Sequence, residues 1–99
     1  MDDNFKKQIA LDFGLTGMEP ANQERIIERI GNMLFEAVVE RSIDEMDEAT
    51  MGDFEELMAS VGQEYQRVID FLKTRVPNFQ AIVSDEMGRL KKATSGIFA

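Results

Sequence analysis

The apolar residues between Ile26 and Met46 recur at steps of three and four, which is the period of an α-helix. Two triplets, Met33-Leu34-Phe35 and Ala37-Val38-Val39, make this apolar surface wider than a single stripe. Glu36 is the only charged residue between them, so we expect contacts with neighbours on two sides. The pattern therefore predicts a long central helix, with every other segment of a small bundle packed against it.

A shorter helix is predicted before this one, because aromatic and apolar residues recur at spacing four over about residues 4–13. Gly14 follows the last aromatic residue, where a left-handed C-cap is common. In the turn that follows, Leu15 and Met18 are expected to fold back onto the bundle as hydrophobic anchors. Pro20 then suits the first position of the central helix, since the N–H that proline lacks would have no helical partner there.

The central helix is expected to end near residues 47–49. Gly31 lies in its interior, at a cost of about 1 kcal/mol relative to alanine. A glycine at this position indicates either a close approach of another helix or a mild bend. Thr50 is the predicted N-cap of the next helix, with an acidic residue three positions later as in a capping box.

Helical spacing of apolar residues continues over residues 50–76, and the pattern leaves open whether this region forms one helix or two. Pro77 ends the run, because the residue before a proline is disfavoured in the α conformation. Asn78 is expected to cap a last helix with a one-sided apolar stripe over about residues 79–93. Residues 94–99 are predicted to form a flexible tail.

These elements predict an all-α fold, a compact bundle of four to five helices around one long central helix, with residues 1–99 as a single domain. The 99 residues are 43% hydrophobic and 30% charged, which suits a folded domain. The sequence contains neither cysteine nor histidine. Disulfides, thiolate metal sites, cysteine nucleophiles and histidine bases are therefore excluded.

The formal net charge of −8 opposes direct nucleic-acid binding, because an acidic surface repels phosphate backbones. The only basic cluster, Arg89, Lys91 and Lys92, has no interleaved aromatic residues and complements the dipole of the last helix. The N-terminus lacks the pattern of a signal peptide, and no apolar run approaches the roughly 20 residues that cross a bilayer. We therefore expect a cytoplasmic protein without membrane contact.

Nine acidic residues and one basic residue lie between Glu36 and Glu56, which raises the question of a calcium site. An EF-hand loop starting at Asp44 would have Ala49 where the motif requires glycine, and a loop starting at Asp47 would have alanine or methionine at three ligand positions. Neither register fits. The carboxylates one helical turn apart are not accompanied by a nucleophile. We predict no metal, no cofactor and no enzymatic activity.

The apolar stripes carry several methionines, which either fill gaps in the core or form an adaptable groove for a partner helix. The stripes together offer more apolar surface than a monomer usually exposes, and a second copy could cover it with one patch used twice. We therefore predict a homodimer built on the Phe35/Val39/Ile43 side of the central helix. The candidate interaction surface comprises Phe35, Val39, Ile43, Met46, Met51, Phe54, Ile97 and Phe98.

Short motifs spread over most of the chain resemble those of a known family. They are Leu11-Asp12-Phe13-Gly14-Leu15, Gln23-Glu24, Arg41, Phe71-Leu72, Val76-Pro77-Asn78-Phe79, Ile82-Val83, Glu86 and Leu90-Lys91. The chain resembles a family of short acidic helical proteins, a domain of unknown function from small-genome candidate-phylum bacteria. Phe13 stands where the family has the first leucine of Leu-Gly-Leu. The resemblance implies an all-helical fold and brings no assigned activity, cofactor or catalytic residue.

Two functional hypotheses follow from the sequence. The first is a non-enzymatic protein–protein interaction module, which is either a homo-oligomer or a small adaptor subunit of a larger assembly. The alternative is an acidic regulatory protein that mimics nucleic acid and blocks a basic site on a partner. The two differ in whether apolar or acidic side chains make the contact, so salt dependence would separate them.

Overall fold

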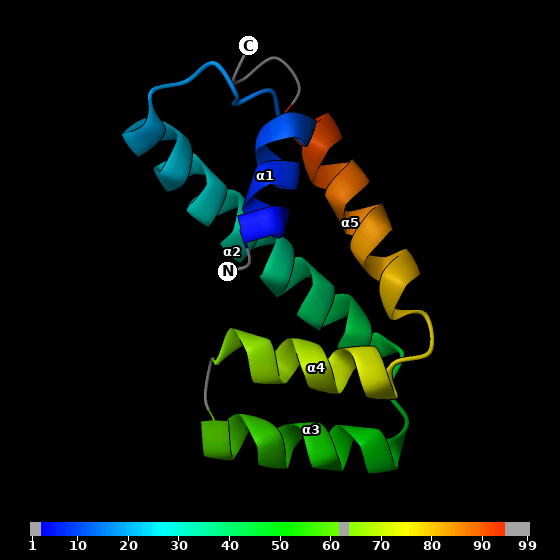
Figure 1. The fold of residues 1–99 in the computed structure, drawn as a ribbon. Coiled ribbons are helices and arrows are strands. Elements are labelled where there is room, and N and C mark those ends of the chain that lie inside the picture. The colour runs from blue at the N-terminus through cyan, green and yellow to red at the C-terminus, as the bar shows by residue number, and fades with distance from the viewer. Residues whose placement is uncertain (1–2, 62–63, 95–99) are drawn as a thin grey trace.

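The computed structural model describes residues 3–61 and 64–94. These residues form five α-helices and no strand: α1 (Asp3–Asp12), α2 (Pro20–Asp44), α3 (Glu48–Val61), α4 (Tyr65–Arg75) and α5 (Phe79–Ala93) (Figure 1). The predicted all-α bundle is confirmed. Predicted positions 97 and 98 of the interaction surface lie outside the described residues, as does most of the predicted tail.

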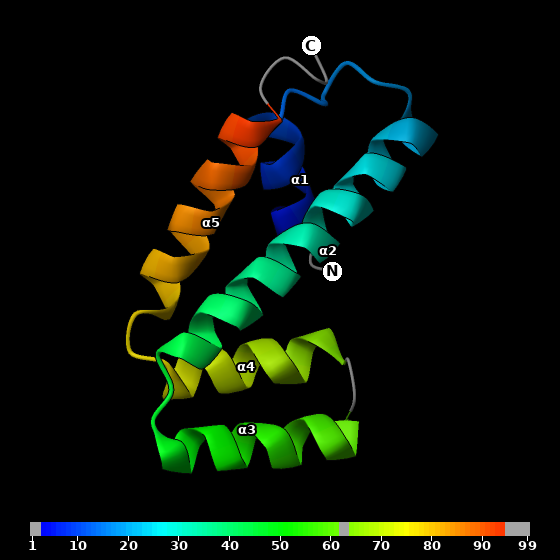
Figure 2. The same ribbon diagram turned by 180° about the vertical axis from the view of Figure 1, so that it is seen from behind.

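The helices are arranged around α2, which runs along most of the molecule (Figures 1 and 2). Helix α5 lies beside α2, α1 lies in the angle between them, and α4 crosses the far end of both. Helix α3 lies outside α4, which is its main neighbour. The prediction that every segment packs onto the central helix is therefore wrong for α3.

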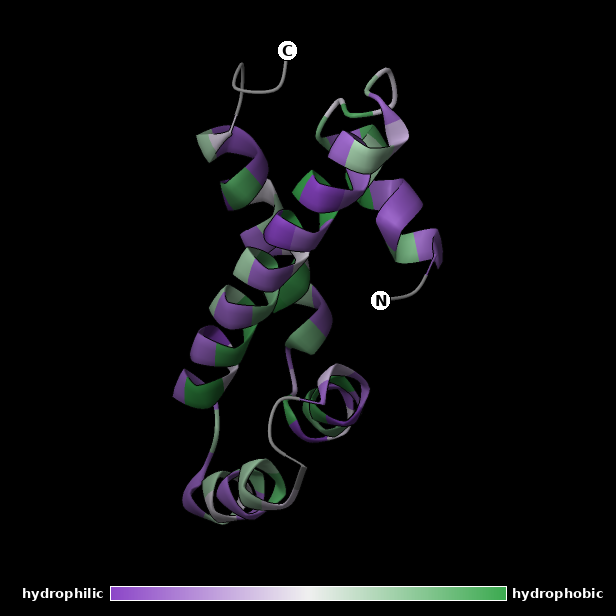
Figure 3. Ribbon diagram, turned by 90° about the vertical axis from the view of Figure 1, so that its left-hand side faces the viewer, coloured by the Kyte–Doolittle hydropathy of each residue, from purple (hydrophilic) through white to green (hydrophobic). Residues whose placement is uncertain are grey.

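The buried apolar residues form two clusters along α2. The N-terminal core comprises Ile9, Ala10, Phe13, Leu15, Ile27 and Ile30. The C-terminal core comprises Leu34, Val38, Phe54, Val68, Leu72, Val76, Phe79 and Ile82. Leu34 and Val38 are 4% and 5% exposed, which confirms the predicted centre of the bundle. Hydrophilic residues follow one side of α2 and hydrophobic residues the opposite side (Figure 3).

The turn after α1 follows the sequence prediction. Gly14 has a φ of 70°, the left-handed conformation that glycine adopts without strain. The Leu15 backbone N–H donates to the Ala10 carbonyl at 2.8 Å, and the Leu15 side chain is fully buried. Met18 is half-buried against the N-terminal core. The turn is thus anchored by its apolar side chains.

The junction between α2 and α3 differs from the prediction. Helix α2 ends at Asp44, before the predicted residues 47–49. Thr50 is not the N-cap of α3, because Asp47 accepts a hydrogen bond of 2.8 Å from the Thr50 backbone N–H. The Asp47 carboxylate therefore caps the N-terminus of α3. The Thr50 side chain is buried instead, with 7% exposed.

The remaining boundaries settle two alternatives that the pattern left open. Residues 50–76 belong to two helices, α3 and α4. Gly31 is buried within continuous α2, which favours close packing over a bend. Helix α4 ends before Pro77, as predicted, and Asn78 is the N-cap residue of α5, although its side chain makes no capping hydrogen bond.

Candidate interaction surfaces

The side of α2 that was predicted to bind a second copy faces other parts of the same chain. Phe35, Val39, Ile43 and Met46 are half-buried and pack against the C-terminal core. The Phe35 ring meets the ring of Tyr65 on α4 edge-on, with centroids 4.4 Å apart. Helix α4 thus covers part of this apolar side, and a homodimer built there stays a prediction.

The remaining predicted residues lie on α3. Phe54 is 5% exposed and belongs to the C-terminal core, and its ring centroid lies 5.7 Å from that of Phe71 on α4. Met51 is half-buried. Phe54 therefore joins α3 to α4 and is not accessible to a partner in this fold.

Arg75 supplies the polar contacts between α3 and α4. Its guanidinium lies 2.9 Å from the Asp53 carboxylate, and its carbon is 5.3 Å from the centroid of the Phe71 ring. One nitrogen also donates to the Thr50 hydroxyl at 3.4 Å. Hydrogen bonds from the Thr50 side chain and backbone N–H, in that order, lower the pKa of Asp47 below its ordinary value, and the charge of Arg75 acts in the same direction.

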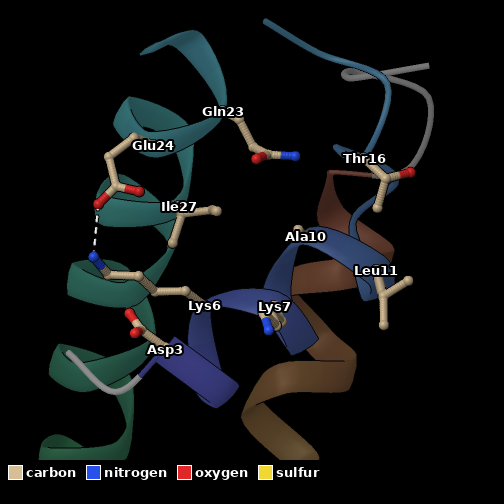
Figure 4. A pocket seen from close by; sticks show the side chains of 9 residues that line it. All are labelled: Asp3, Lys6, Lys7, Ala10, Leu11, Thr16, Gln23, Glu24 and Ile27. Atoms are coloured by element: carbon tan, nitrogen blue, oxygen red, sulfur yellow. Dashed lines mark hydrogen bonds and ion pairs between the residues drawn. The ribbon is translucent and has the colours of Figure 1, made fainter. Parts of the chain in front are cut away.

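A groove of about 470 Å³ lies between α1 and the first half of α2 (Figure 4). We call it the α1–α2 groove. Its lining is half charged and half apolar or neutral polar: Asp3, Lys6, Lys7, Ala10, Leu11, Thr16, Gln23, Glu24 and Ile27.

Two side-chain contacts hold the walls of the α1–α2 groove. Lys6 Nζ lies 2.7 Å from Glu24 Oε1, which ties α1 to α2 (Figure 4). The hydrogen bond to Glu24 raises the pKa of Lys6 above its ordinary value. At the opposite end, Gln23 Nε2 donates to the Leu15 carbonyl at 2.8 Å and so fixes the turn that carries Thr16.

Three large hydrophobic side chains are exposed in the part of the chain that the structure describes: Leu11 at 66%, Met33 at 50% and Tyr65 at 43%. The sequence prediction placed none of them on the interaction surface, and it placed Met33 on a packed stripe. Leu11 could have been found, because it lies two residues after Ile9 and two before Phe13, which puts it on the opposite side of α1. It lines the α1–α2 groove beside Thr16 (Figure 4).

Charge is distributed very unevenly along the chain. Residues 36–64, which we call the acidic segment, carry ten acidic residues and only one basic residue, Arg41. Residues 3–29, which form α1 and the first part of α2, carry five acidic and four basic residues. Arg41 lies 3.4 Å from Asp85 on α5, so its charge is already engaged. Residues 3–29, which include those that line the α1–α2 groove, are thus nearly balanced in charge.

The described residues contain no group of three or more acidic side chains arranged to hold a metal ion. Within the same residues, no helix is long and apolar enough to cross a membrane. Glu86 is buried at 8% exposure, and Arg89 lies 4.0 Å from its carboxylate.

Comparison with known proteins identifies one family. No match is found among curated proteins or among solved structures. A family model described as "Protein of unknown function (DUF5663)" matches residues 9–94, which include all five helices except the first turns of α1. Because this match covers most of the 99 residues, the chain belongs to this family of unknown function.

Proposed function

We propose that this protein is a non-enzymatic protein–protein interaction module that binds through the α1–α2 groove. The observation that supports this is Leu11, a large apolar side chain that is 66% exposed at a groove with an apolar floor. An isolated exposed leucine is common on protein surfaces, and this one supports a binding role because it lies beside a concave surface. Ala10 and Ile27 supply buried apolar surface in the same groove.

The proposal places the protein in the cytoplasm of a small-genome candidate-phylum bacterium, in agreement with the resemblance. There it acts as a homo-oligomer or as a small adaptor subunit, without a cofactor. The lack of histidine and cysteine agrees with a function that rests on contacts.

Site-specific photocrosslinking tests this proposal, and the lack of cysteine makes it simple. A benzophenone maleimide is attached to Leu11→Cys in the groove and, as a matched control, to Met33→Cys, whose side chain is also half or more exposed. The labelled proteins are irradiated in the cytosol of the native host at physiological salt. We expect a discrete protein adduct from position 11 and none from position 33. No adduct from position 11 would contradict the groove as a binding surface.

A second candidate function rests on the acidic segment. Asp44 and Glu45 lie at the C-terminal end of α2, where the negative end of the helix dipole disfavours carboxylates. Exposed acids at a position that costs stability suggest a role in recognition, such as mimicry of nucleic acid at a basic site of a partner. Such a complex should weaken steeply between about 0.1 and 0.5 M salt. An affinity that stays constant over this range would contradict mimicry and favour an apolar contact.

A further inference from the structure

Electrostatic repulsion limits which surfaces of two copies of this chain can come into contact. Each copy carries a net charge of −8, and the acidic segment accounts for this excess with ten acids against one base. Helix α3, which carries part of that segment, lies at the opposite end of the molecule from α1 (Figures 1 and 2). Unlike the acidic segment, the surface around α1 can meet its own copy with little repulsion.

The charged residues that line the α1–α2 groove are balanced. Two are acidic, Asp3 and Glu24, and two are basic, Lys6 and Lys7. The structure records an ion pair for Lys6, and among the described residues it records none for Lys7. A two-fold interface brings a patch against itself, so a patch with equal numbers of both signs can pair its charges across the axis.

The same surface carries both a projection and a hollow. Leu11 projects at the end of the groove, with 66% of its surface exposed, and Ala10 and Ile27 form apolar floor in the hollow. In an isologous contact, residue i of one copy meets residue j of the other and the reverse holds as well. In such a contact, the projection of each copy would fill the hollow of the other, so the same apolar contact is made twice.

We propose that the α1–α2 groove is the contact face of a homodimer in which Leu11 of each copy inserts beside Ala10 and Ile27 of the other. This rests on the proposed function and names the partner of the same surface as a second copy. An interface formed by α1 and the adjoining turns of α2 alone is small, so we expect a weak dimer.

This location differs from the side of α2 around Phe35, Val39 and Ile43. Those side chains are half-buried against the C-terminal core, where Phe35 meets Tyr65 of α4, and the acids Glu36 and Glu40 are exposed on the same helix. A dimer there would bring two acidic segments together and would tighten strongly with added salt. The groove dimer should change by less than about threefold between 0.1 and 0.5 M salt, where charges more than about 10 Å apart are already screened.

Sedimentation equilibrium of the purified full chain tests the proposal from about 10 µM to 1 mM. We expect reversible dimers for the wild type and at least a tenfold weaker association for Leu11→Glu, because a carboxylate at the contact loses hydration. Met33→Glu is the matched control: it puts the same charge on an exposed apolar position outside the groove and should leave association unchanged. Circular dichroism melts verify that both variants are folded.

Three results would overturn the second copy as the occupant: a monomer throughout the concentration range, a dimer that Met33→Glu weakens as much as Leu11→Glu, or a dimer that tightens steeply with salt. The photocrosslink at position 11 then distinguishes a failure of the homodimer from a failure of the proposed function. An adduct with twice the mass of the chain supports the homodimer. An adduct with a different protein, together with a monomer in sedimentation, overturns the homodimer and leaves the proposed function intact. No adduct at all contradicts both.

Discussion

The groove end and the hairpin end of this molecule are both built on α2, yet they present different surfaces. The groove end comprises α1, the turn after it and the first half of α2, and it has nearly balanced charges and an exposed Leu11. The hairpin end comprises the antiparallel pair α3–α4 and the second half of α2. It buries Phe54 in the C-terminal core, leaves Tyr65 on α4 43% exposed, and exposes most of the acids of the acidic segment.

The two proposals assign different kinds of recognition to the two ends. The hairpin end packs most of its methionines and aromatic residues against its own core, so the proposed mimicry there would act through charge. The groove end leaves Leu11 and a hollow outside its core, so the proposed interaction there would act through burial. If the comparison is right, substitutions at the two ends should affect stability and association separately.

The largest effect is expected in the C-terminal core. Leu34→Ala should lower the free energy of unfolding by about 2–5 kcal/mol, because a side chain that is 4% exposed loses its burial and leaves a cavity. Met33→Ala is the matched control, since the adjacent residue is 50% exposed, and it should cost less than about 0.5 kcal/mol. Urea unfolding measures both. A loss below about 1 kcal/mol for Leu34→Ala would place the centre of the bundle elsewhere.

The attachment of α3 gives the next largest effect. Arg75→Met removes the ion pair with Asp53 and the contact with the Phe71 ring, and retains much of the apolar stem. We expect a loss of about 1–2 kcal/mol, the sum of a partly exposed ion pair and a cation–π contact. Hydrogen exchange should show the loss first in α3, because α4 is the main neighbour of α3. Lys73→Met, on the same helix and exposed, should change neither quantity.

The cap of α3 is a smaller test, and it carries a pH dependence. Asp47→Ala removes the acceptor for the Thr50 N–H and should lower the melting temperature by about 5 °C at pH 7. The lowered pKa of Asp47 means that its charge stabilises the fold fully above the ordinary value of 3.8. That part is lost as pH falls through the folded value, which lies below 3.8.

Asp47→Asn is the variant that isolates the charge, because asparagine also caps helices but does not titrate. Its melting temperature should lie between those of the wild type and Asp47→Ala at pH 7. The difference from the wild type should shrink as pH falls below about 4. A difference that stays constant with pH would mean that the carboxylate charge contributes nothing to the cap.

Periodicity in the sequence predicted the helices because their apolar stripes are long and regular. Periodicity could not predict where α3 lies. An apolar stripe such as that around Phe54 indicates that one side of the helix is buried, but it does not identify the helix that packs against it. The N-cap was misassigned because Asp47 and Thr50 are both good capping residues, and only the backbone geometry chooses between them.

The candidate surface was harder to predict than the fold. Phe35 and Val39 sit on the edge of a wide apolar stripe, where the sequence alone does not tell internal packing from binding. Leu11 was overlooked because a single leucine outside a stripe looks like ordinary surface. Its significance comes from the groove, which brings together residues from α1, α2 and the turn between them.

The smallest expected effect concerns the ion pair across the groove, and it tests whether the groove end depends on charge. Lys6→Met removes the 2.7 Å contact with Glu24 and keeps an apolar stem of similar length along α1. We expect the melting temperature to fall by less than about 3 °C at pH 7, because exposed ion pairs contribute little. Since the pKa of Lys6 is raised, its contribution is fully present below the ordinary value of 10.5 and is lost only as pH rises through the higher folded value. Melts at about 0.05 and 0.5 M salt should bring the variant and the wild type together at the higher concentration. A fall of more than about 5 °C at the lower salt concentration that disappears at the higher one would show that charge, and not the N-terminal core, holds α1 against α2, and the contrast between the two ends would then be wrong.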